Sequence, residues 1–222
     1  ALVVESANDA SGGFRCRRGR QAQRLLAEVD LLLADVATEQ HLIARGGLAM
    51  RTPLGTDIVL RALTVADEAV FHSVRRANAA WLGPWDATSP DPAAPLRGFA
   101  ELVAHYDAEA RAGRSMPLVV EAEGRLVGQL SIGGIMLGSF RSCLVGYWVS
   151  RSVAGRMVIP TALAVAGDHA IEALGLHRIE VNIRPENTAS LAVVRKLGFR
   201  DEGLRLNYLH IDGAWRDHRS FA

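Results

Sequence analysis

Residues 184–199 read RPENTASLAVVRKLGF, and the strand-like run HRIEVN precedes them at 177–182. Asn187 suits the N-cap of a helix, because its side-chain oxygen can accept a hydrogen bond from an N–H two or three residues later. Taken alone, this residue could be a helix cap and nothing more. The stretch predicts a strand over 178–184, a turn, and a helix from Asn187 that ends near Leu197-Gly198.

Upstream of that stretch, residues 144–149 (LVGYWV) predict a strand that runs into a loop with Gly155. A helix is expected from this loop to about Leu174. The first N–H groups of such a helix lack internal partners, and the helix dipole is positive there. This arrangement suits an anion such as a pyrophosphate, although a single glycine before a helix is often only a turn.

The remaining segments between residues 57 and 221 alternate strand and helix signals. A helix is expected to begin at Thr64–Asp67, to be broken by WLGPW at 81–85, and to be followed by a Pro-rich loop to Pro95 and a second helix over 96–111. Further strands are expected at 57–61, 117–122, 125–133, 142–149, 203–211 and 215–221. This pattern predicts one α/β (α+β) domain with a single, largely antiparallel sheet rather than βαβ repeats.

The first 50 residues are expected to form an N-terminal extension of a domain that covers residues 51–222. Residues 1–19 predict a loose arm, and apolar residues at helical spacing predict one amphipathic helix over 20–45. Met50 would make a natural start for the domain that follows. A basic run in the arm could touch ribosomal RNA, but a solvated arm accounts for it better.

Composition excludes several classes of function. The formal net charge of +1 gives no general attraction to nucleic acid or membranes, and no apolar run approaches the ~18 residues of a membrane span. Cys16 and Cys143 lie far apart, and the seven histidines are scattered, so neither a disulfide framework nor a metal site is expected. We expect a cytoplasmic protein.

The sequence resembles the GNAT family of N-acetyltransferases, and within it the RimJ/RimL group that acetylates ribosomal-protein N-termini. The matching residues are 177–179, 184–190, 196–199 and 202–203, followed by a RimJ-like ending over 208–218. Asn78, Leu82, Pro84 and Trp85 resemble an early element of the same group. The resemblance covers about residues 57–222 and says nothing about the first 50.

The resemblance implies a GNAT fold, in which a mixed sheet flanked by helices splays at its centre and takes acetyl-CoA into the opening. The pantetheine arm would pair with the free edge of the strand that ends at Val149, as an added strand would. A backbone N–H at that strand's end would stabilise the oxyanion of the tetrahedral intermediate. The implied cofactor-binding residues are Tyr147, Trp148, Val149, Ala154, Gly155, Arg156, Met157, Val158, Ile159, Asn187 and Ser190.

Two departures from the family pattern concern the phosphate loop and the proton donor. Ala154 stands where the family has Gln or Arg, and Met157 replaces a glycine, which predicts weakened rather than abolished acetyl-CoA binding. Pro160 is harmless if it lies in the first helical turn. Val194 occupies the position of a common catalytic tyrosine, so the resemblance points to Ser190 as the proton donor; the alternative is an ordinary first-turn serine.

The general base is not identifiable from the sequence. Candidates are Tyr208, His210, Glu180 and Asp212, each with a structural alternative as a strand, sheet-pairing or turn residue. We take Ser190 and Tyr208 as the candidate catalytic pair. Trp85 and Asn78 are expected to border the acceptor slot, although core packing would also account for a tryptophan.

The leading hypothesis is direct transfer of an acetyl group from acetyl-CoA to an amine through a ternary complex. The most favoured acceptor is the N-terminal α-amine of a protein, by analogy a ribosomal protein. An α-amine costs only about 1 kcal/mol to deprotonate at pH 7, whereas a lysine costs roughly 4–5 kcal/mol. The alternatives are acetylation of small-molecule amines and a GNAT-fold binding protein with little or no activity. Either a monomer or a homodimer is compatible.

Overall fold

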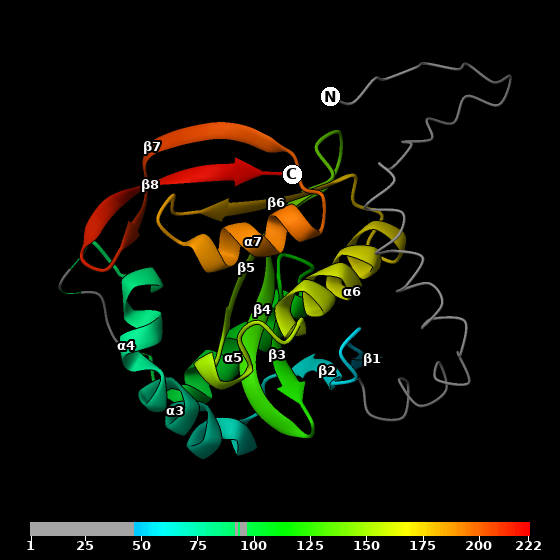
Figure 1. The fold of residues 1–222 in the computed structure, drawn as a ribbon, viewed down its shortest axis with the longest axis vertical. Coiled ribbons are helices and arrows are strands. Elements are labelled where there is room, and N and C mark those ends of the chain that lie inside the picture. Colours follow the sequence, from blue (N-terminus) through cyan, green and yellow to red (C-terminus); the bar gives the residue numbers. More distant parts are fainter. Residues whose placement is uncertain (1–46, 92, 94–96) are drawn as a thin grey trace, which may run out of the picture.

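The computed structural model describes residues 47–91, 93 and 97–222 (Figure 1). The expected arm (1–19) and amphipathic helix (20–45) lie outside the described residues. The strands are β1 (Leu48–Arg51), β2 (Asp57–Ala62), β3 (Met116–Ala122), β4 (Arg125–Met136), β5 (Ser142–Val149), β6 (Arg178–Ile183), β7 (Asp201–Ile211) and β8 (Ala214–Phe221). The helices are α3 (Glu68–Ala77), α4 (Ala79–Leu82), α5 (Phe99–Arg111), α6 (Val158–Glu172) and α7 (Thr188–Lys196), with 3-10 turns η1 (Val65–Asp67), η2 (Gly83–Trp85) and η3 (Arg151–Val153).

The eight strands form one sheet in the order β1-β2-β3-β4-β5-β6-β8-β7. Every neighbouring pair is antiparallel except β5 and β6, which run parallel and pair only from Ser142–Leu144 to Arg178–Glu180. Beyond that short ladder the two strands diverge, as Figure 1 shows where β5 runs down and away from β6. The predicted mixed, mostly antiparallel sheet with an opening at its centre is confirmed.

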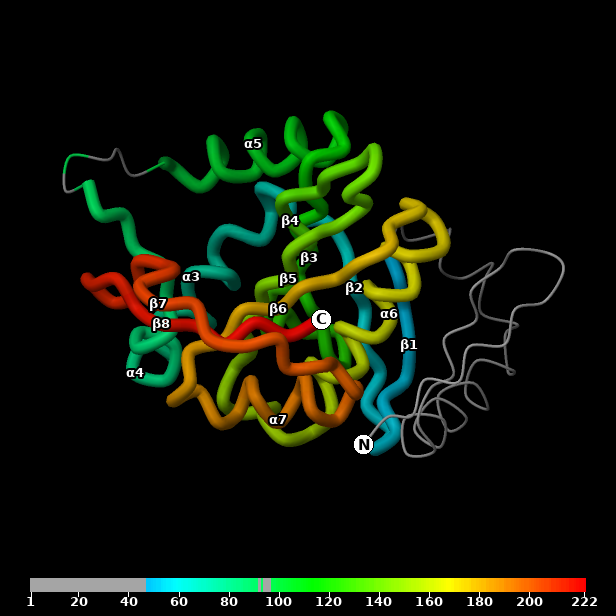
Figure 2. The backbone as a smooth tube through the Cα atoms, turned by 90° about the horizontal axis from the view of Figure 1, so that it is seen from above, coloured from blue at the N-terminus to red at the C-terminus, as the bar shows by residue number. Residues whose placement is uncertain are grey.

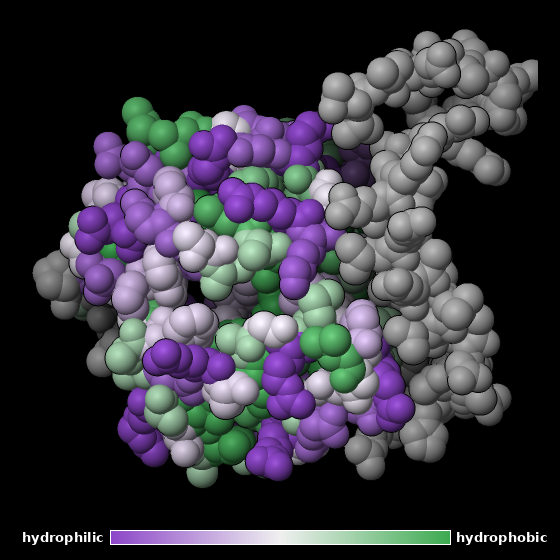
Figure 3. Space-filling view, in the orientation of Figure 1, coloured by the Kyte–Doolittle hydropathy of each residue, from purple (hydrophilic) through white to green (hydrophobic). Residues whose placement is uncertain are grey.

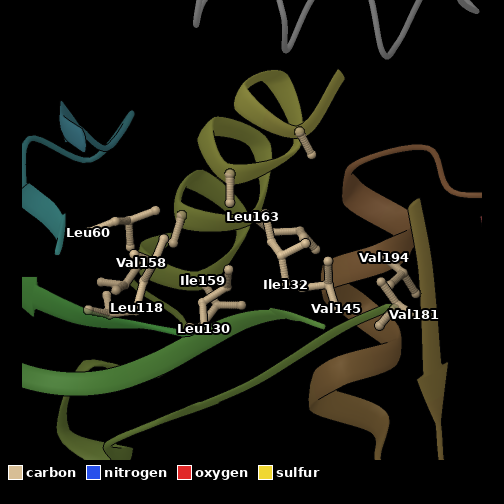
Figure 4. Close-up of a cluster of buried hydrophobic side chains, with 14 of the residues drawn as sticks. Leu60, Leu118, Leu130, Ile132, Val145, Val158, Ile159, Leu163, Val181 and Val194 are labelled. Atoms are coloured by element: carbon tan, nitrogen blue, oxygen red, sulfur yellow. The ribbon is translucent and has the colours of Figure 1, made fainter. Parts of the chain in front are cut away.

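Helices cover both faces of the sheet. Figure 2 shows α5 on one face and α7 on the opposite face. The main core lies between the sheet and the pair α6 and α7, where Ile159 and Leu163 of α6 meet Leu130 and Ile132 of β4 (Figure 4). A smaller core under α5 gathers Phe99, Val103, Val119, Leu126 and Leu63. The sheet, with its opening between β5 and β6, therefore lies between α5 on one side and α6 and α7 on the other.

The structure corrects several predicted boundaries. The break in the first helix falls at Asn78 rather than at 81–85, because α4 already carries Trp81 and Leu82. Helix α5 begins at Phe99, where the Gly98 N–H donates to the Glu101 side chain at 3.1 Å, and not at 96. Strand β4 continues to Met136 through an irregularity after Gly133.

Strand β1 was not predicted, and it crosses the expected domain boundary at residue 50. Leu48, Ala49 and Met50 pair with Leu60, Val59 and Ile58 of β2. A four-residue strand is too short to show the alternation that identifies strands in a sequence. Its place in the sheet comes from Leu48 and Met50, which pack against the main core.

Candidate active site

A cleft of about 530 Å³ enters the molecule where β5 and β6 separate. Its walls come from α4 and η2, from the ends of β4 and β5, from the loop before α6, and from one side of α7. In Figure 3 the same face is hollowed just below α7. Ten of the eleven predicted cofactor-binding residues line this cleft, together with Trp85. They are Tyr147, Trp148, Val149, Ala154, Gly155, Met157, Val158, Ile159, Asn187 and Ser190.

Strand β5 presents free backbone groups to the cleft. The Ser150 N–H donates to the Val127 carbonyl of β4 at 2.7 Å, so the other side of that peptide group, the Val149 C=O, points away from β4. The Trp148 carbonyl oxygen faces β4, because it comes so close to Gly128 that a Cβ atom added there would lie only 2.4 Å from it. Since the two ends of a peptide group point in opposite directions, the Val149 N–H faces the opening.

The loop between β5 and α6 uses two left-handed residues. Gly155 has φ = +80° and Met157, the N-cap of α6, has φ = +62°. Met157 thus adopts the conformation that glycine takes easily and other residues take at a cost of about 1–2 kcal/mol. Pro160 lies in the first turn of α6, where its missing N–H costs nothing, as expected.

Lys196, at the carboxyl end of α7, lines the same cleft, and its Nζ lies 3.4 Å from the Met157 Sδ. A thioether is a weak hydrogen-bond acceptor and carries no charge. No carboxylate in the described part of the chain forms an ion pair with this ammonium group. The sequence analysis did not select Lys196, although it is the only lysine in the chain.

Helix α7 brings Asn187 and Ser190, from the stretch 184–199, to the opening of the sheet. The Asn187 Oδ1 accepts from the Ser190 N–H at 3.1 Å, which confirms the predicted N-cap. The Tyr147 hydroxyl of β5 reaches across and donates to the Ser190 carbonyl oxygen at 3.4 Å. Burial raises the pKa of Tyr147 to about 12, against a weaker opposing effect of this hydrogen bond, so the phenol stays protonated at neutral pH.

The α4–η2 segment forms one wall of the cleft and carries Trp81 and Trp85. Arg184, just beyond β6, donates to the Pro84 carbonyl at 2.7 Å, and its guanidinium lies 5.3 Å from the centre of the Trp85 ring. This Arg184 contact bridges the two separated halves of the sheet. The wall continues into the β7–β8 hairpin, where the Thr88 N–H donates to the His210 carbonyl at 3.0 Å.

A partly buried polar network lines the cleft on the side of α5. The Gln129 amide nitrogen donates to the Tyr106 hydroxyl at 3.3 Å and lies 3.4 Å from the Ser131 hydroxyl. The Trp148 indole donates to the Gln129 amide oxygen at 3.2 Å. The sequence analysis missed Tyr106, Gln129 and Ser131, because the three polar residues lie in segments whose patterns indicate only a helix and a strand.

Three predicted site residues lie elsewhere. Asn78 is 8% exposed and, with Arg156, borders a second hollow beside the loop. The Tyr208 hydroxyl lies 3.4 Å from the Asn182 amide nitrogen, and its ring packs on His218 at 5.6 Å between centroids. Neither Asn78 nor Tyr208 is among the residues that line the cleft.

The other base candidates hold structural contacts. Burial by itself raises the pKa of Glu180, yet hydrogen bonds from Asn182 and Arg178 and the charge of Arg205 together lower it below its usual value. Such a carboxylate is a weak base. The His210 Nδ1 lies 2.8 Å from the Thr88 hydroxyl, and Asp212 occupies the β7–β8 turn with φ = +47°.

His218, which the sequence analysis did not consider as a base, is 3% exposed, and burial lowers the pKa of its ring. Its Nδ1 lies 3.0 Å from the Arg216 carbonyl oxygen. In the neutral ring this contact places the proton on Nδ1 and leaves Nε2 as an acceptor. His218 packs against the Tyr208 ring and, like Tyr208, is not among the residues that line the cleft.

The described residues contain neither a cluster of metal-ligating side chains nor a membrane-spanning helix. Within 47–91, 93 and 97–222, no group of three or more His, Cys, Asp or Glu side chains could hold a metal ion. No helix in the same ranges has the length and apolar character needed to cross a bilayer.

A mixed sheet that opens between two parallel strands, with a helix N-terminus beside the opening, characterises an α/β protein whose cleft suits an extended ligand that carries phosphate. Residues 57–200 match the acetyltransferase (GNAT) domain family. The chain therefore belongs to the GNAT family of acetyltransferases, as the sequence resemblance predicted.

Two bacterial proteins are among the relatives that match this chain. A probable N-acetyltransferase, YjcK of Bacillus subtilis, is 33% identical over 46% of this chain and 56% of its own length. The [ribosomal protein uS5]-alanine N-acetyltransferase of Escherichia coli is 34% identical over 43% of this chain and 50% of its own length. The chain thus spans about half the length of the curated relatives it matches.

Solved structures match over more of the chain. Mycobacterium smegmatis RimJ in complex with CoA-disulfide is 39% identical, with a TM-score of 0.72, and the match covers 79% of this chain and 85% of that one. A ribosomal-protein-S5-alanine acetyltransferase from Vibrio fischeri, 24% identical with a TM-score of 0.66, shares the fold.

Proposed function

We propose that this protein transfers an acetyl group from acetyl-CoA to the N-terminal α-amine of a protein, and that a ribosomal protein is its natural acceptor. The observation that carries the proposal is the cleft at the divergence of β5 and β6, lined by the free edge of β5, the loop before α6 and the first turn of α7. The names of the similar proteins, RimJ and the ribosomal-protein uS5-alanine N-acetyltransferase, support the acceptor. We place this reaction in the cytoplasm.

Acetyl-CoA would lie across the opening with its pantetheine arm along β5 and its pyrophosphate at the N-terminus of α6. The backbone groups of Tyr147 are the free partners for the arm, which leaves the Val149 N–H for the thioester carbonyl. Phosphate groups would meet the unpaired N–H groups and the positive dipole end of α6. Lys196 supplies a cation to the same loop.

The chemistry needs a neutral amine, an oxyanion donor and a proton for the leaving thiolate. The amine attacks the thioester carbonyl, and the Val149 N–H stabilises the negative oxygen of the tetrahedral intermediate. Collapse of the intermediate breaks the C–S bond, and the Ser190 hydroxyl donates a proton to the CoA thiolate. The proton that the amine loses passes through water toward solvent, and the Tyr208 hydroxyl, which does not line the cleft, acts as a relay that accepts this proton while it releases its own. Ser190 recovers a proton from water, so both hydroxyls end the cycle protonated.

The lining of the cleft favours a protein α-amine over a polyamine or an aminoglycoside. Among the described residues that line it, Asp86 is the only carboxylate, and its Oδ2 is paired with Arg75 at 2.6 Å. Recognition of a polycation needs several free carboxylates. Aromatic and uncharged polar groups form the acceptor side instead: Trp81, Trp85, Trp148, Tyr106, Gln129 and Ser131.

The test incubates the full chain with acetyl-CoA and short peptides that begin with Ala or Ser, and measures release of CoA. We expect turnover of these peptides, little turnover of their N-terminally blocked forms, and none of spermidine or an aminoglycoside. A Ser190→Ala variant should lose most of kcat with a small change in the KM for acetyl-CoA, because the hydroxyl acts after binding. Equal turnover of free polyamines would favour the small-molecule alternative.

A binding protein without activity is the remaining alternative, and calorimetry separates it from the enzyme. Acetyl-CoA that binds the folded state must raise the melting temperature by mass action. No heat of binding and no thermal shift at millimolar acetyl-CoA would exclude the proposed enzyme. Binding without turnover of any peptide would identify a regulatory module.

A further inference from the structure

The elbow between α3 and α4 is attached to the end of β5 by two side chains that come from far away in the sequence. Asn78 stands between the two helices, and Trp81 lies one turn later in α4. The Trp81 indole N–H donates to the Val149 carbonyl oxygen at 3.0 Å. The Asn78 Oδ1 accepts from the Arg151 N–H at 2.9 Å.

These contacts fix two consecutive peptide groups. The peptide between Val149 and Ser150 is held on one side by the Trp81 indole and on the other by the Val127 carbonyl, which accepts from the Ser150 N–H. The next peptide is held through the Arg151 N–H by Asn78. The chain therefore leaves β5 in a direction that α3 and α4 determine.

The side-chain amide of Asn78 is hydrogen-bonded on both of its ends. It is 8% exposed, its amide nitrogen donates to the Val74 carbonyl at 2.8 Å, and its amide oxygen also accepts from the Ser150 hydroxyl at 3.3 Å. Both ends of the amide are therefore engaged, one by the end of α3 and the other by the loop. Both polar atoms of the amide therefore have partners within the fold, which leaves only its second N–H for any further contact.

The peptide groups held by Asn78 and Trp81 lie between the two regions that would bind acetyl-CoA. On one side lies the open edge of β5 with the Val149 N–H, and on the other lies the loop that leads through Gly155 to the N-terminus of α6. A ligand that lies along β5 and ends at α6 must fit both at once. The distance and angle between these two binding regions depend on how the chain turns at 149–151.

We propose that Asn78 and Trp81 are positioning residues that hold the open edge of β5 and the phosphate loop in register, so that the two halves of acetyl-CoA bind together. This inference rests on the proposed function. Two linked halves bind much more tightly than either alone only when the protein presents both subsites at the correct separation. Loss of the anchor should weaken the whole ligand and leave each half nearly unaffected.

The experiment compares CoA with two of its fragments, pantetheine and 3′,5′-ADP, on Asn78→Ala and Trp81→Phe variants of the full chain. We expect an increase of about tenfold in the Kd for CoA and changes below about twofold in the Kd values for pantetheine and 3′,5′-ADP. Trp81→Phe keeps a smaller aromatic ring in the wall and removes the indole donor, so it reports on the contact even if Asn78→Ala destabilises the fold.

Two control variants separate the anchor from general effects. Ser150→Ala removes the 3.3 Å hydroxyl contact with Asn78 and leaves the Arg151 N–H bond in place, so its Kd for CoA should stay within about twofold of the wild type. Trp215→Phe alters an exposed tryptophan of β8 and should leave the Kd values for CoA, pantetheine and 3′,5′-ADP unchanged.

The outcomes are distinct. An unchanged Kd for CoA in both Asn78→Ala and Trp81→Phe overturns the inference and leaves the proposed function intact. A parallel loss of affinity for pantetheine overturns it as well, because that pattern indicates direct contact with the arm. Failure of the wild-type chain to bind CoA at all overturns the proposed function together with the inference.

Discussion

At the scale of single residues, Met157 is the main departure from the family pattern. Its backbone is left-handed, with φ = +62°, a conformation that glycine would adopt without strain. Its side chain lies beside Lys196, in the region where a phosphate would lie.

Replacing Met157 by glycine should relieve strain and clear this region. We expect Met157→Gly to be more stable than Met157→Ala by about 1 kcal/mol, because alanine keeps the left-handed strain and glycine does not. Both variants should bind acetyl-CoA several-fold more tightly than the wild type, because both remove the thioether. Urea unfolding and calorimetry measure the two quantities. Tighter binding by Met157→Gly alone would show that the backbone, and not the side chain, limits the affinity.

Lys196 should contribute to phosphate binding through its charge. An exposed ammonium group that meets a phosphate contributes about 1 kcal/mol after solvent screening, so Lys196→Gln should weaken CoA binding about fivefold. The loss should shrink at high salt, and Lys196→Arg should restore most of the affinity. Titration calorimetry at two ionic strengths checks this. Equal affinities of Lys196→Gln and the wild type at low salt would remove Lys196 from the site.

At the scale of elements, an ion-pair network joins β2, β3 and the turn before α3. Arg61 makes two hydrogen bonds to Asp67, each 2.8 Å long, and two to Glu121, at 2.6 and 2.8 Å. These bonds, led by those from Arg61, lower the pKa of Asp67 to about 2, although burial opposes the shift. Asp67 also accepts from the N–H and the hydroxyl of Thr64, so it starts the helix that leads to Asn78.

The lowered pKa of Asp67 sets the pH dependence of its contribution. The folded state holds the ionised carboxylate, so the stabilisation is complete above the ordinary pKa of 3.8 and disappears as the pH falls toward 2. Asp67→Asn should cost about 2 kcal/mol at pH 7 and almost nothing near pH 2. Denaturant unfolding across this range measures it. Asp57→Asn, which breaks an exposed pair with Arg51, is the control and should have little effect at either pH.

At the scale of the whole molecule, the sheet has two parts that share only a short ladder between β5 and β6. Contacts outside the sheet hold the parts together around the cleft. Arg184 joins β6 to the η2 turn, and Tyr147 of β5 reaches the Ser190 carbonyl of α7. The far edge of the sheet, at β1, lies away from these contacts (Figure 1).

The position of β1 tests the predicted domain boundary. A chain that begins at Arg51 lacks Leu48 and Met50, which pack against the core, and should be less stable by about 2–4 kcal/mol than one that begins at Gly47. Its affinity for CoA at low temperature should be unchanged, because β1 is four strands from β5. Thermal unfolding and calorimetry check the two statements. Equal stability of the two chains would support the boundary at residue 50.

The sequence by itself determined the elements that depend on short-range contacts. The strand and helix around residues 184–199 and the Asn187 cap were predictable, because a cap joins residues only three positions apart. The mixed sheet with a central opening was predicted from the family resemblance. The same short stretch carries the family resemblance, so the family was predictable with it. The boundaries of α5 and β4 were less accurate, because a cap side chain and a bulge decide them.

Only the tertiary structure decided the composition of the cleft and the role of Asn78. The bonds from Trp81 to Val149, from Tyr147 to Ser190 and from Arg151 to Asn78 span 68, 43 and 73 residues. No periodicity or spacing in a sequence encodes such pairs, because they form when separate elements pack against one sheet. Asn78 has the residue type expected of a substrate ligand, yet the packing of α3 against the end of β5 engages both ends of its amide.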